Sequence, residues 1–310
     1  MKRLPPPALA LSFVTSLALL VGVAAASAQS PGVPVVKEGH GPPPETLEAA
    51  KKLREAGKLL RMEVVREQLS RTNCDLILPK PGTRRLAAPE IWDRARKAHW
   101  RVGYYYLCNN CSNWHLNLAG AYAISASGAI ATCHHVVLPK DMKEGYLIAA
   151  TDGGTVMPVL EVLAADKFTD TAILRIAPGE QFAPLPLNTN VRPGEEAFCY
   201  SDPAGHPAYF SRGMVNRFYQ HWHGENAKEA KDLFPQRMNV STDWAPGSSG
   251  SAVLDEFGNA IGHVSEISAH GNTPPATAKD GKTGASNTYI VFHNAVRAAD
   301  VLALVRQLKK

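Results

Sequence analysis

The amino-acid sequence predicts an all-β fold built from two six-stranded antiparallel β-barrels. From Val102 onward, roughly twelve short runs rich in β-forming residues follow one another. The runs fall into two groups, and the second group begins after residue 190. Glycine, proline, aspartate and asparagine separate the runs, which is typical of turns between antiparallel strands. Two such groups favour a pair of barrels.

Residues 1–28 have the features of a secretory signal peptide. Lys2 and Arg3 give a positive start, and an uncharged apolar run extends to the small-residue pattern Ala26-Ser27-Ala28. The alternative is an uncleaved membrane anchor, for which the run is barely long enough, and membrane association is expected only in that case. We therefore expect export, to the periplasm or out of the cell.

The rest of the chain divides into residues 29–88 and a domain of residues 89–310. Residues 29–44 form a linker rich in proline and glycine. The spacing of apolar residues over 45–70 predicts an amphipathic helix, either packed on the domain or acting as a spacer. A partner-binding role for this helix is less favoured. Residues 71–88 resemble another connector.

The domain is expected to begin and end with a helix. The first runs from Pro89 to Lys97, and the second is an apolar-periodic helix from Asn294 to Leu308. The predicted strands between them are Val102–Leu107, Gly120–Ser125, Ala129–Thr132, Tyr146–Ala150, Val156–Ala164, Ala172–Ile176, Glu196–Ser201, Gly213–Tyr219, Met238–Ser241, Ala252–Leu254, Ala260–Ser265 and Thr288–Phe292.

The charge balance gives no sign of a polyanionic partner. The chain has a net charge of +5, and loss of Lys2 and Arg3 with the leader lowers it to +3. This is too weak to favour nucleic acid or an anionic membrane.

The five cysteines all follow residue 28. The odd number leaves at least one unpaired or paired between chains. Cys108 and Cys111 lie three residues apart, before His115, and we prefer a hairpin disulfide to a zinc site because no second Cys/His pair has suitable spacing. Cys133 is either a buried free thiol or a partner of Cys199. No metal site is predicted, and for His221, His223 and Glu225 a solvated loop is favoured over metal binding.

The strongest sign of chemistry is the stretch PGSSGSAVLDEFGNAIGHVS, which begins at Pro246. A nucleophilic serine needs an exposed hydroxyl and nearby backbone N–H groups that can hold an oxyanion. Ser249 stands in such a setting, and the amides of Gly247 and Ser249 would be the donors. A Gly/Ser hairpin turn is the alternative.

A nucleophilic serine also needs a base and an acid that orients the base. The stretch ATCHHVV supplies His134 and His135, and DKFTDTAILRI places Asp170 just before an apolar run. Neighbours on a strand-like segment point to opposite sides, so only one of the two histidines can face Ser249.

From about residue 99 to residue 310, the chain resembles the trypsin-like (chymotrypsin-fold) serine proteases, especially the exported bacterial branch that includes the HtrA-type proteases. Four stretches carry the resemblance in the family's order: AGAYAISASGAIATCHHVV, DKFTDTAILRI, RPGEEAFCYSDPAGHPAYFSRGMVNR and PGSSGSAVLDEFGNAIGHVS. In the family a Val-(Val/Ile/Leu) pair follows the catalytic histidine, which selects His135. The resemblance implies an endopeptidase with a His135–Asp170–Ser249 triad, an acyl-enzyme and no cofactor.

The resemblance also implies where substrate binds. Ser265 would lie beside the substrate backbone, Glu266 and Ile267 would line the specificity pocket, and Asn287 would stand opposite. Asp243 lies six residues before Ser249, where trypsin places the acid that selects Arg or Lys. We expect no basic preference, because Ile267 is bulky where a deep pocket needs glycine; a turn role for Asp243 is the alternative.

Two departures from the family restrict this interpretation. Ser248 replaces the aspartate that trypsin-type zymogens use to bind a newly cut N-terminus, so activation by that route is not expected. No PDZ module is expected after the C-terminal helix. The predicted partner is a protein or peptide substrate, and the sequence does not indicate an oligomeric state. The competing hypotheses are a non-catalytic peptide-binding domain and an envelope-associated structural protein whose function lies in residues 45–70.

Overall fold

The computed structural model describes residues 35–36, 38, 43–139, 142–177, 182–221, 229, 233–271 and 288–308. Residues 1–35 form a separate unit, and the fold below is that of the unit from Val36 onward. The predicted leader and most of the predicted linker lie outside the described residues. No helix among the residues described is long and apolar enough to cross a membrane.

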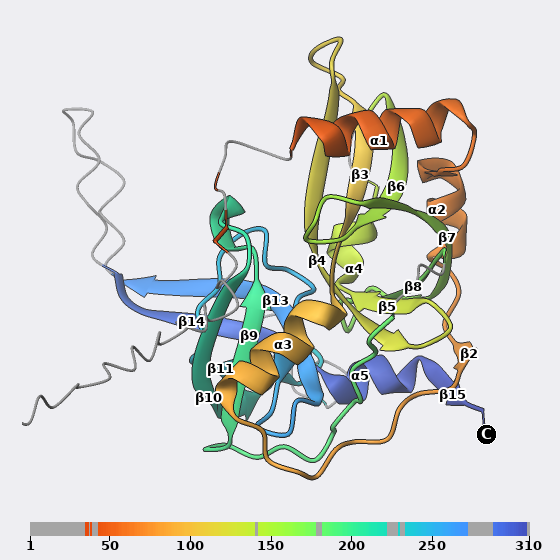
Figure 1. The fold of residues 1–310 in the computed structure, drawn as a ribbon. Coiled ribbons are helices and arrows are strands. Elements are labelled where there is room, and N and C mark those ends of the chain that lie inside the picture. The colour runs from red at the N-terminus through yellow and green to blue at the C-terminus, as the bar shows by residue number, and fades with distance from the viewer. Residues whose placement is uncertain are drawn as a thin grey trace, which may run out of the picture. The chain divides into compact units, whose positions relative to one another are not determined.

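The first barrel is a ring of six antiparallel strands (Figure 1). Its order is β6-β3-β4-β5-β8-β7, and β7 pairs back with β6 to close the ring. Inside it, branched aliphatic side chains such as Val102, Ile130 and Leu174 are fully buried. The strands are β3 (His99–Leu107), β4 (Trp114–Ser125), β5 (Ala129–Thr132), β6 (Glu144–Ala150), β7 (Val156–Asp166) and β8 (Thr171–Ile176).

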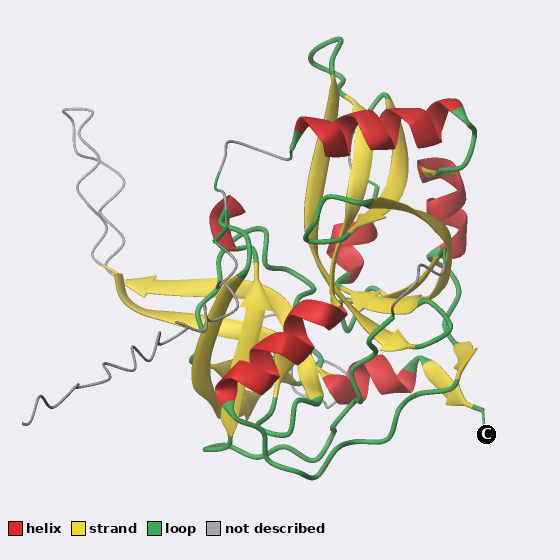
Figure 2. Cartoon of the chain, viewed as in Figure 1, coloured by secondary structure: helices red, strands yellow, loops and turns green. Residues whose placement is uncertain are grey.

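The second barrel is also closed and six-stranded, with the order β10-β11-β14-β13-β12-β9. Its interior holds Val215, Met238, Val253 and Val264, all buried. The prediction of two six-stranded barrels is therefore confirmed, and Figure 2 shows strands as the main element of both. The strands are β9 (Glu196–Ser201), β10 (Tyr209–Tyr219), β11 (Arg237–Val240), β12 (Ala252–Leu254), β13 (Ala260–Gly271) and β14 (Thr288–Arg297).

The prediction of a single helix over residues 45–70 is wrong in detail, because the structure has two helices in this segment. Helix α1 (Pro44–Glu55) ends where Gly57 takes a left-handed conformation with φ of 67°, and helix α2 (Met62–Gln68) follows after the short strand β1 (Leu60–Arg61). Strand β1 pairs with β6. Ala50 of α1 packs on Tyr105 and Ile148 of the first barrel, so this extension is part of the domain's core rather than a spacer.

The helix predicted over Asn294–Leu308 is also shorter than expected. Residues Asn294–Arg297 belong to β14, because their backbone groups pair with β11 and β13. The helix that remains is α5 (Ala298–Ala303), followed by strand β15 (Val305–Gln307). Strand β15 pairs in parallel with β2 (Cys74–Leu76), which lies in the predicted connector. Helix α3 (Ala88–Ala98) confirms the predicted helix at the start of the domain.

Candidate active site

The two neighbouring histidines do not lie on a strand. Strand β5 ends at Thr132, and His134 and His135 begin a single helical turn, α4 (His134–Val137). The two-sided strand argument is thus wrong for this segment, although the turn still separates the two side chains. His134 is buried, and burial lowers the pKa of its imidazole. The side chain of His135 is 46 % exposed.

Asp170 holds His135 in a fixed orientation. The aspartate closes the turn between β7 and β8, where its φ is 61°, and its side chain is 16 % exposed. Its carboxylate oxygens lie 2.9 and 3.1 Å from Nδ1 of His135. The backbone N–H of His135 donates to the same carboxylate at 3.0 Å. Both the imidazole and its backbone are therefore fixed by one acid.

The carboxylate of Asp170 is strongly biased towards its ionised form. Burial by itself raises its pKa, but the hydrogen bonds and charge of His135, together with the Ser265 hydroxyl, hold the pKa of this carboxyl well below its usual range. The hydroxyl of Ser265 donates to Asp170 Oδ2 at 2.8 Å. A carboxylate that stays ionised favours a proton on the facing Nδ1, which leaves Nε2 of His135 free to accept a proton.

Ser249 lies in the loop between β11 and β12, on the second barrel. Its hydroxyl donates to the backbone carbonyl of Ser265 at 3.2 Å. Ser265 stands at a β-bulge of β13, since the pairing with β14 shifts between Val264 and Glu266. Ser265 thus contacts Asp170 through its hydroxyl and Ser249 through its carbonyl. The hydrogen bonds of the described residues do not join Ser249 directly to His135.

The loop that carries Ser249 is built around two glycines with positive φ. Gly247 has φ of 103° and Gly250 has φ of 84°. A Cβ at residue 250 would lie 2.2 Å from both the carbonyl oxygen of Gly120 and Oγ1 of Thr132, which belong to the first barrel. A Cβ at residue 247 would lie 2.8 Å from the carbonyl oxygen of Asp202. Only glycine permits these close approaches, so both positions fix the loop.

Some backbone N–H groups of this loop donate hydrogen bonds within the protein, and others do not. Those of Ser248, Gly250 and Ser251 donate to the carbonyls of Ala245, Val264 and Ser248, respectively. Within the described part of the chain, the amides of Gly247 and Ser249 donate to no other residue. These are the two donors that the sequence predicts for an oxyanion.

The comparisons with known proteins agree with this architecture. Residues 120–262 match the family model of the trypsin-like peptidase domain, and the match includes His135, Asp170 and Ser249. Residues 120–262 therefore form a trypsin-like peptidase domain. No curated protein matches the chain.

A solved structure of an HtrA-type protease shares the fold of this trypsin-like domain. The structure of HtrA-type protease AlgW with a decapeptide has a TM-score of 0.50 and 19 % identity, covering 71 % of this chain and 66 % of that chain. The structure of AlgW with a tripeptide has a TM-score of 0.48 and 20 % identity, covering 68 % of this chain and 60 % of that chain. The structure of the serine endoprotease from Yersinia pestis has a TM-score of 0.45 and 18 % identity, covering 70 % of this chain and 64 % of that chain. The match thus spans about two thirds or less of the length of these chains.

The predicted substrate-binding residues of the trypsin-like domain form two neighbouring segments. Trp244, which the sequence interpretation missed, is buried and donates its indole N–H to the carbonyl of Glu266 at 3.3 Å. This bond joins the segment of Asp243 to that of Ser265, Glu266 and Ile267. Glu266 and Ile267 are exposed. Asn287 lies outside the described residues.

The side chain of Asp243 has its own partner. It is exposed, and it accepts a hydrogen bond from the Tyr209 hydroxyl at 3.4 Å. The backbone N–H of Asp243 donates to Oγ of Ser211. The predicted alternative, a carboxylate that accepts backbone N–H groups in a turn, is not what the described residues show. Its partner is a tyrosine on β10.

A largely buried polar network that the sequence interpretation missed supports the loop of Ser249. Asp202 accepts bonds from Nε of Arg101 at 2.5 Å and Nη2 of Arg101 at 3.1 Å, and it lies 3.4 Å from Nε2 of His99. The network links β3 of the first barrel to the segment after β9. The Ala204 N–H then donates to the carbonyl of Pro246, next to Gly247. Residue patterns do not indicate this link, because its members lie about 100 residues apart.

Cys133 and His263 lie behind the site, and both are fully buried. The Cys133 thiol donates to the carbonyl of Val264 at 3.0 Å, and burial raises its pKa. Nε2 of His263 lies 3.5 Å from the backbone carbonyl of Asp170. The sequence-based role for Cys133 as a free buried thiol is therefore confirmed over pairing with Cys199.

The buried His263 is expected to make the protein sensitive to acid. Burial lowers the pKa of its imidazole from 6.5 to about 4, so the unfolded chain binds a proton in this interval before the folded protein does. The contribution of neutral His263 to the free energy of unfolding is fully present above pH 6.5. It falls by about 3 kcal/mol as the pH drops to about 4. Urea unfolding at about pH 7 and about pH 4 measures the free energy of unfolding of wild type and of His263→Gln. The drop between the two pH values should be smaller in His263→Gln than in wild type by this amount. An exposed control, His270→Gln, should behave as wild type; equal acid losses in wild type and His263→Gln would contradict the expectation.

Proposed function

We propose that this protein is an exported serine endopeptidase whose triad is His135, Asp170 and Ser249. The observation that carries the proposal is the fixed imidazole of His135, with Nδ1 held by an ionised Asp170. Ser249 lies within the same hydrogen-bonded group, because Ser265 contacts both Asp170 and Ser249. An acid that orients a base, beside a serine in a glycine-built loop, is the arrangement that acyl transfer requires.

In the proposed mechanism, Ser249 attacks the carbonyl carbon of the scissile peptide bond. Its hydroxyl turns from the carbonyl of Ser265 to Nε2 of His135, which takes the proton. The amides of Gly247 and Ser249 hold the oxyanion that develops on the substrate carbonyl. His135 then gives its proton to the leaving amine, and an acyl-enzyme on Ser249 remains. Water attacks the acyl-enzyme by the same route, and no cofactor takes part.

The proposed substrate is a protein or peptide. The exposed segment Glu266–Ile267 follows Ser265 on β13, so an extended peptide could lie beside it, with Asp243 near the specificity pocket. AlgW, whose fold is similar, is described in complex with a decapeptide. Export rests on the signal-like character of residues 1–28.

One observation favours a second candidate function, a domain that binds peptides without cleaving them. The Ser249 hydroxyl donates to the Ser265 carbonyl and not to His135. A serine held in that way is not activated until its hydroxyl turns. The binding function would use the same Ser265–Ile267 segment, so only the chemistry of Ser249 separates the two candidates.

The experiment is to treat the purified chain with a fluorophosphonate probe, which reacts covalently with an activated serine. The endopeptidase proposal expects labelling of wild type and of Ser248→Ala, its matched neighbour, and none of Ser249→Ala. It also expects wild type and Ser248→Ala, without probe, to cleave an unfolded protein substrate, and Ser249→Ala to leave it intact. A folded wild type that never labels and cleaves nothing, yet binds peptides, would establish the second candidate instead.

A further inference from the structure

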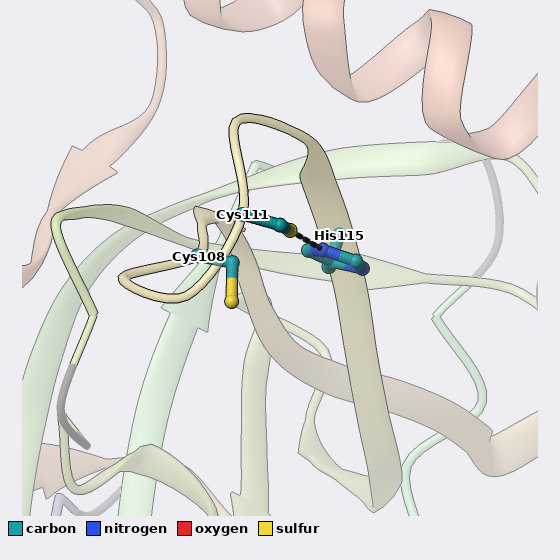
Figure 3. A group of neighbouring side chains, drawn as sticks. All are labelled: Cys108, Cys111 and His115. Carbon is teal, nitrogen blue, oxygen red and sulfur yellow. Dashed lines mark hydrogen bonds between the residues drawn. The ribbon is translucent and has the colours of Figure 1, made fainter.

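The hairpin between β3 and β4 gathers three side chains that bind metals in other proteins. Cys108 and Cys111 lie in its loop, and His115 is the second residue of β4 (Figure 3). Their potential ligand atoms all lie within 4.8 Å of one another. Cys111 is exposed, and Cys108 and His115 are partly exposed, so an ion can reach them from solvent.

The two cysteines do not form the hairpin disulfide that the sequence predicts. All five cysteines lie in the described part of the chain, and each is a free thiol. Sγ of Cys111 instead lies 3.0 Å from Nε2 of His115, and Figure 3 shows these two side chains pointing toward each other.

The backbone of the loop prepares Cys108 to act as a thiolate. The Cys108 N–H donates to the carbonyl of Asn113 at 3.3 Å, which closes the loop. The Asn110 N–H donates to Sγ of Cys108 at 3.3 Å. An N–H group that donates to sulfur stabilises its ionised form, and the thiolate is the form that binds metals.

The donor set selects a soft ion. Two thiolates and one imidazole suit zinc, which binds sulfur at about 2.3 Å and nitrogen at about 2.0–2.1 Å in a tetrahedron. Ligand atoms around such an ion lie about 3.5–3.8 Å apart. The present separations, from 3.0 Å to at most 4.8 Å, bracket this value, so only small side-chain rotations are needed.

We propose that Cys108, Cys111 and His115 bind one Zn²⁺ ion at the tip of the β3–β4 hairpin, with a fourth position left to water. Binding displaces the thiol protons of the two cysteines, so it releases up to two protons and becomes tighter as the pH rises. None of the triad residues takes part, and the site is independent of the proposed peptidase activity. Its effect is to fix an exposed loop of the first barrel.

The test uses the full mature chain, purified with its thiols reduced and metal removed. Co²⁺ is added first, because its thiolate complexes absorb light, and Zn²⁺ is then titrated in to displace it. We expect one ion per chain and protection of two thiols from a thiol reagent. Cys108→Ser, Cys111→Ser and His115→Gln should each weaken binding by more than the roughly 10–100-fold cost of losing an outer-shell partner. His206→Gln, an exposed histidine elsewhere, should bind as wild type.

Three results would overturn the proposal. One is the absence of a Co²⁺–thiolate absorption band in wild type that is folded by circular dichroism. Another is equal Zn²⁺ affinity in wild type and all three ligand variants. The last is a Cys108–Cys111 disulfide, detected by mass spectrometry, in protein isolated from its native compartment without reductant. The folding of each variant is checked by its thermal unfolding curve, so a lost site and a lost fold remain distinguishable.

Discussion

Replacing His135 by alanine is expected to lower the rate of peptide hydrolysis by about 10⁴-fold or more, while His134→Ala keeps it within the same order of magnitude. The two neighbours differ in their contacts. His135 faces Asp170 at 2.9 Å and is exposed to solvent, whereas His134 is buried. Steady-state rates on an unfolded protein substrate measure the difference.

The buried position of His134 requires a control for folding. Its removal takes out a buried side chain and is expected to cost stability of about 1–3 kcal/mol. Rates are therefore measured well below the unfolding temperature of each variant. An inactive but folded His134→Ala beside an active His135→Ala would reverse the assignment of the base.

Replacing Asp170 by asparagine is expected to lower kcat by about 10⁴-fold, with little change in KM. The amide keeps the size of the side chain, but its NH2 group facing Nδ1 of His135 favours a proton on Nε2, the nitrogen that must accept one. Asparagine also loses the negative charge that stabilises the protonated imidazole. The kcat of wild type and of the variant is measured as a function of pH. The carboxylate of Asp170 is ionised across the mildly acidic range, so it contributes no transition to the wild-type profile there.

A matched control for this change is Asp166→Asn in the same turn. Asp166 accepts bonds from the Phe168 N–H and the Thr169 hydroxyl, and asparagine retains an oxygen for one of them. We expect its rate to stay within the same order of magnitude as wild type. Equal losses in the two variants would mean that the turn, and not the charge facing His135, accounts for the effect of Asp170→Asn.

The sequence predicts the strands well because most of them are short apolar runs between turn residues. Ala129–Thr132, Glu196–Ser201 and Ala252–Leu254 have the predicted bounds. The helical predictions are weaker at their ends. Apolar spacing alone does not reveal that Gly57 ends α1, or that residues 294–297 pair with two strands. Helix α1 ends in a local left-handed cap at Gly57, whereas at residues 294–297 backbone hydrogen bonds to distant strands override the apolar spacing.

The candidate site could be predicted only in part, for a similar reason. His135, Asp170 and Ser249 stand in local motifs, and the structure places His135 against Asp170, with Ser249 joined to them through Ser265. The supporting contacts lack such motifs. Asp202 meets Arg101 across the barrels, and Trp244 meets the Glu266 carbonyl. Such pairs depend on how two closed barrels pack, which residue spacing does not encode.

The parallel pairing of β2 with β15 has a consequence for how the protein folds. These strands lie about 230 residues apart, and the Cys74 N–H donates to the carbonyl of Leu304 at 2.9 Å. Contacts between such distant segments form slowly, since a long loop must close before they stabilise anything. A chain emerging from a ribosome therefore cannot complete this sheet until residues 305–307 are free to pair. Strand β2 stays without this partner until then, so its backbone N–H and C=O groups remain open to other strands during synthesis.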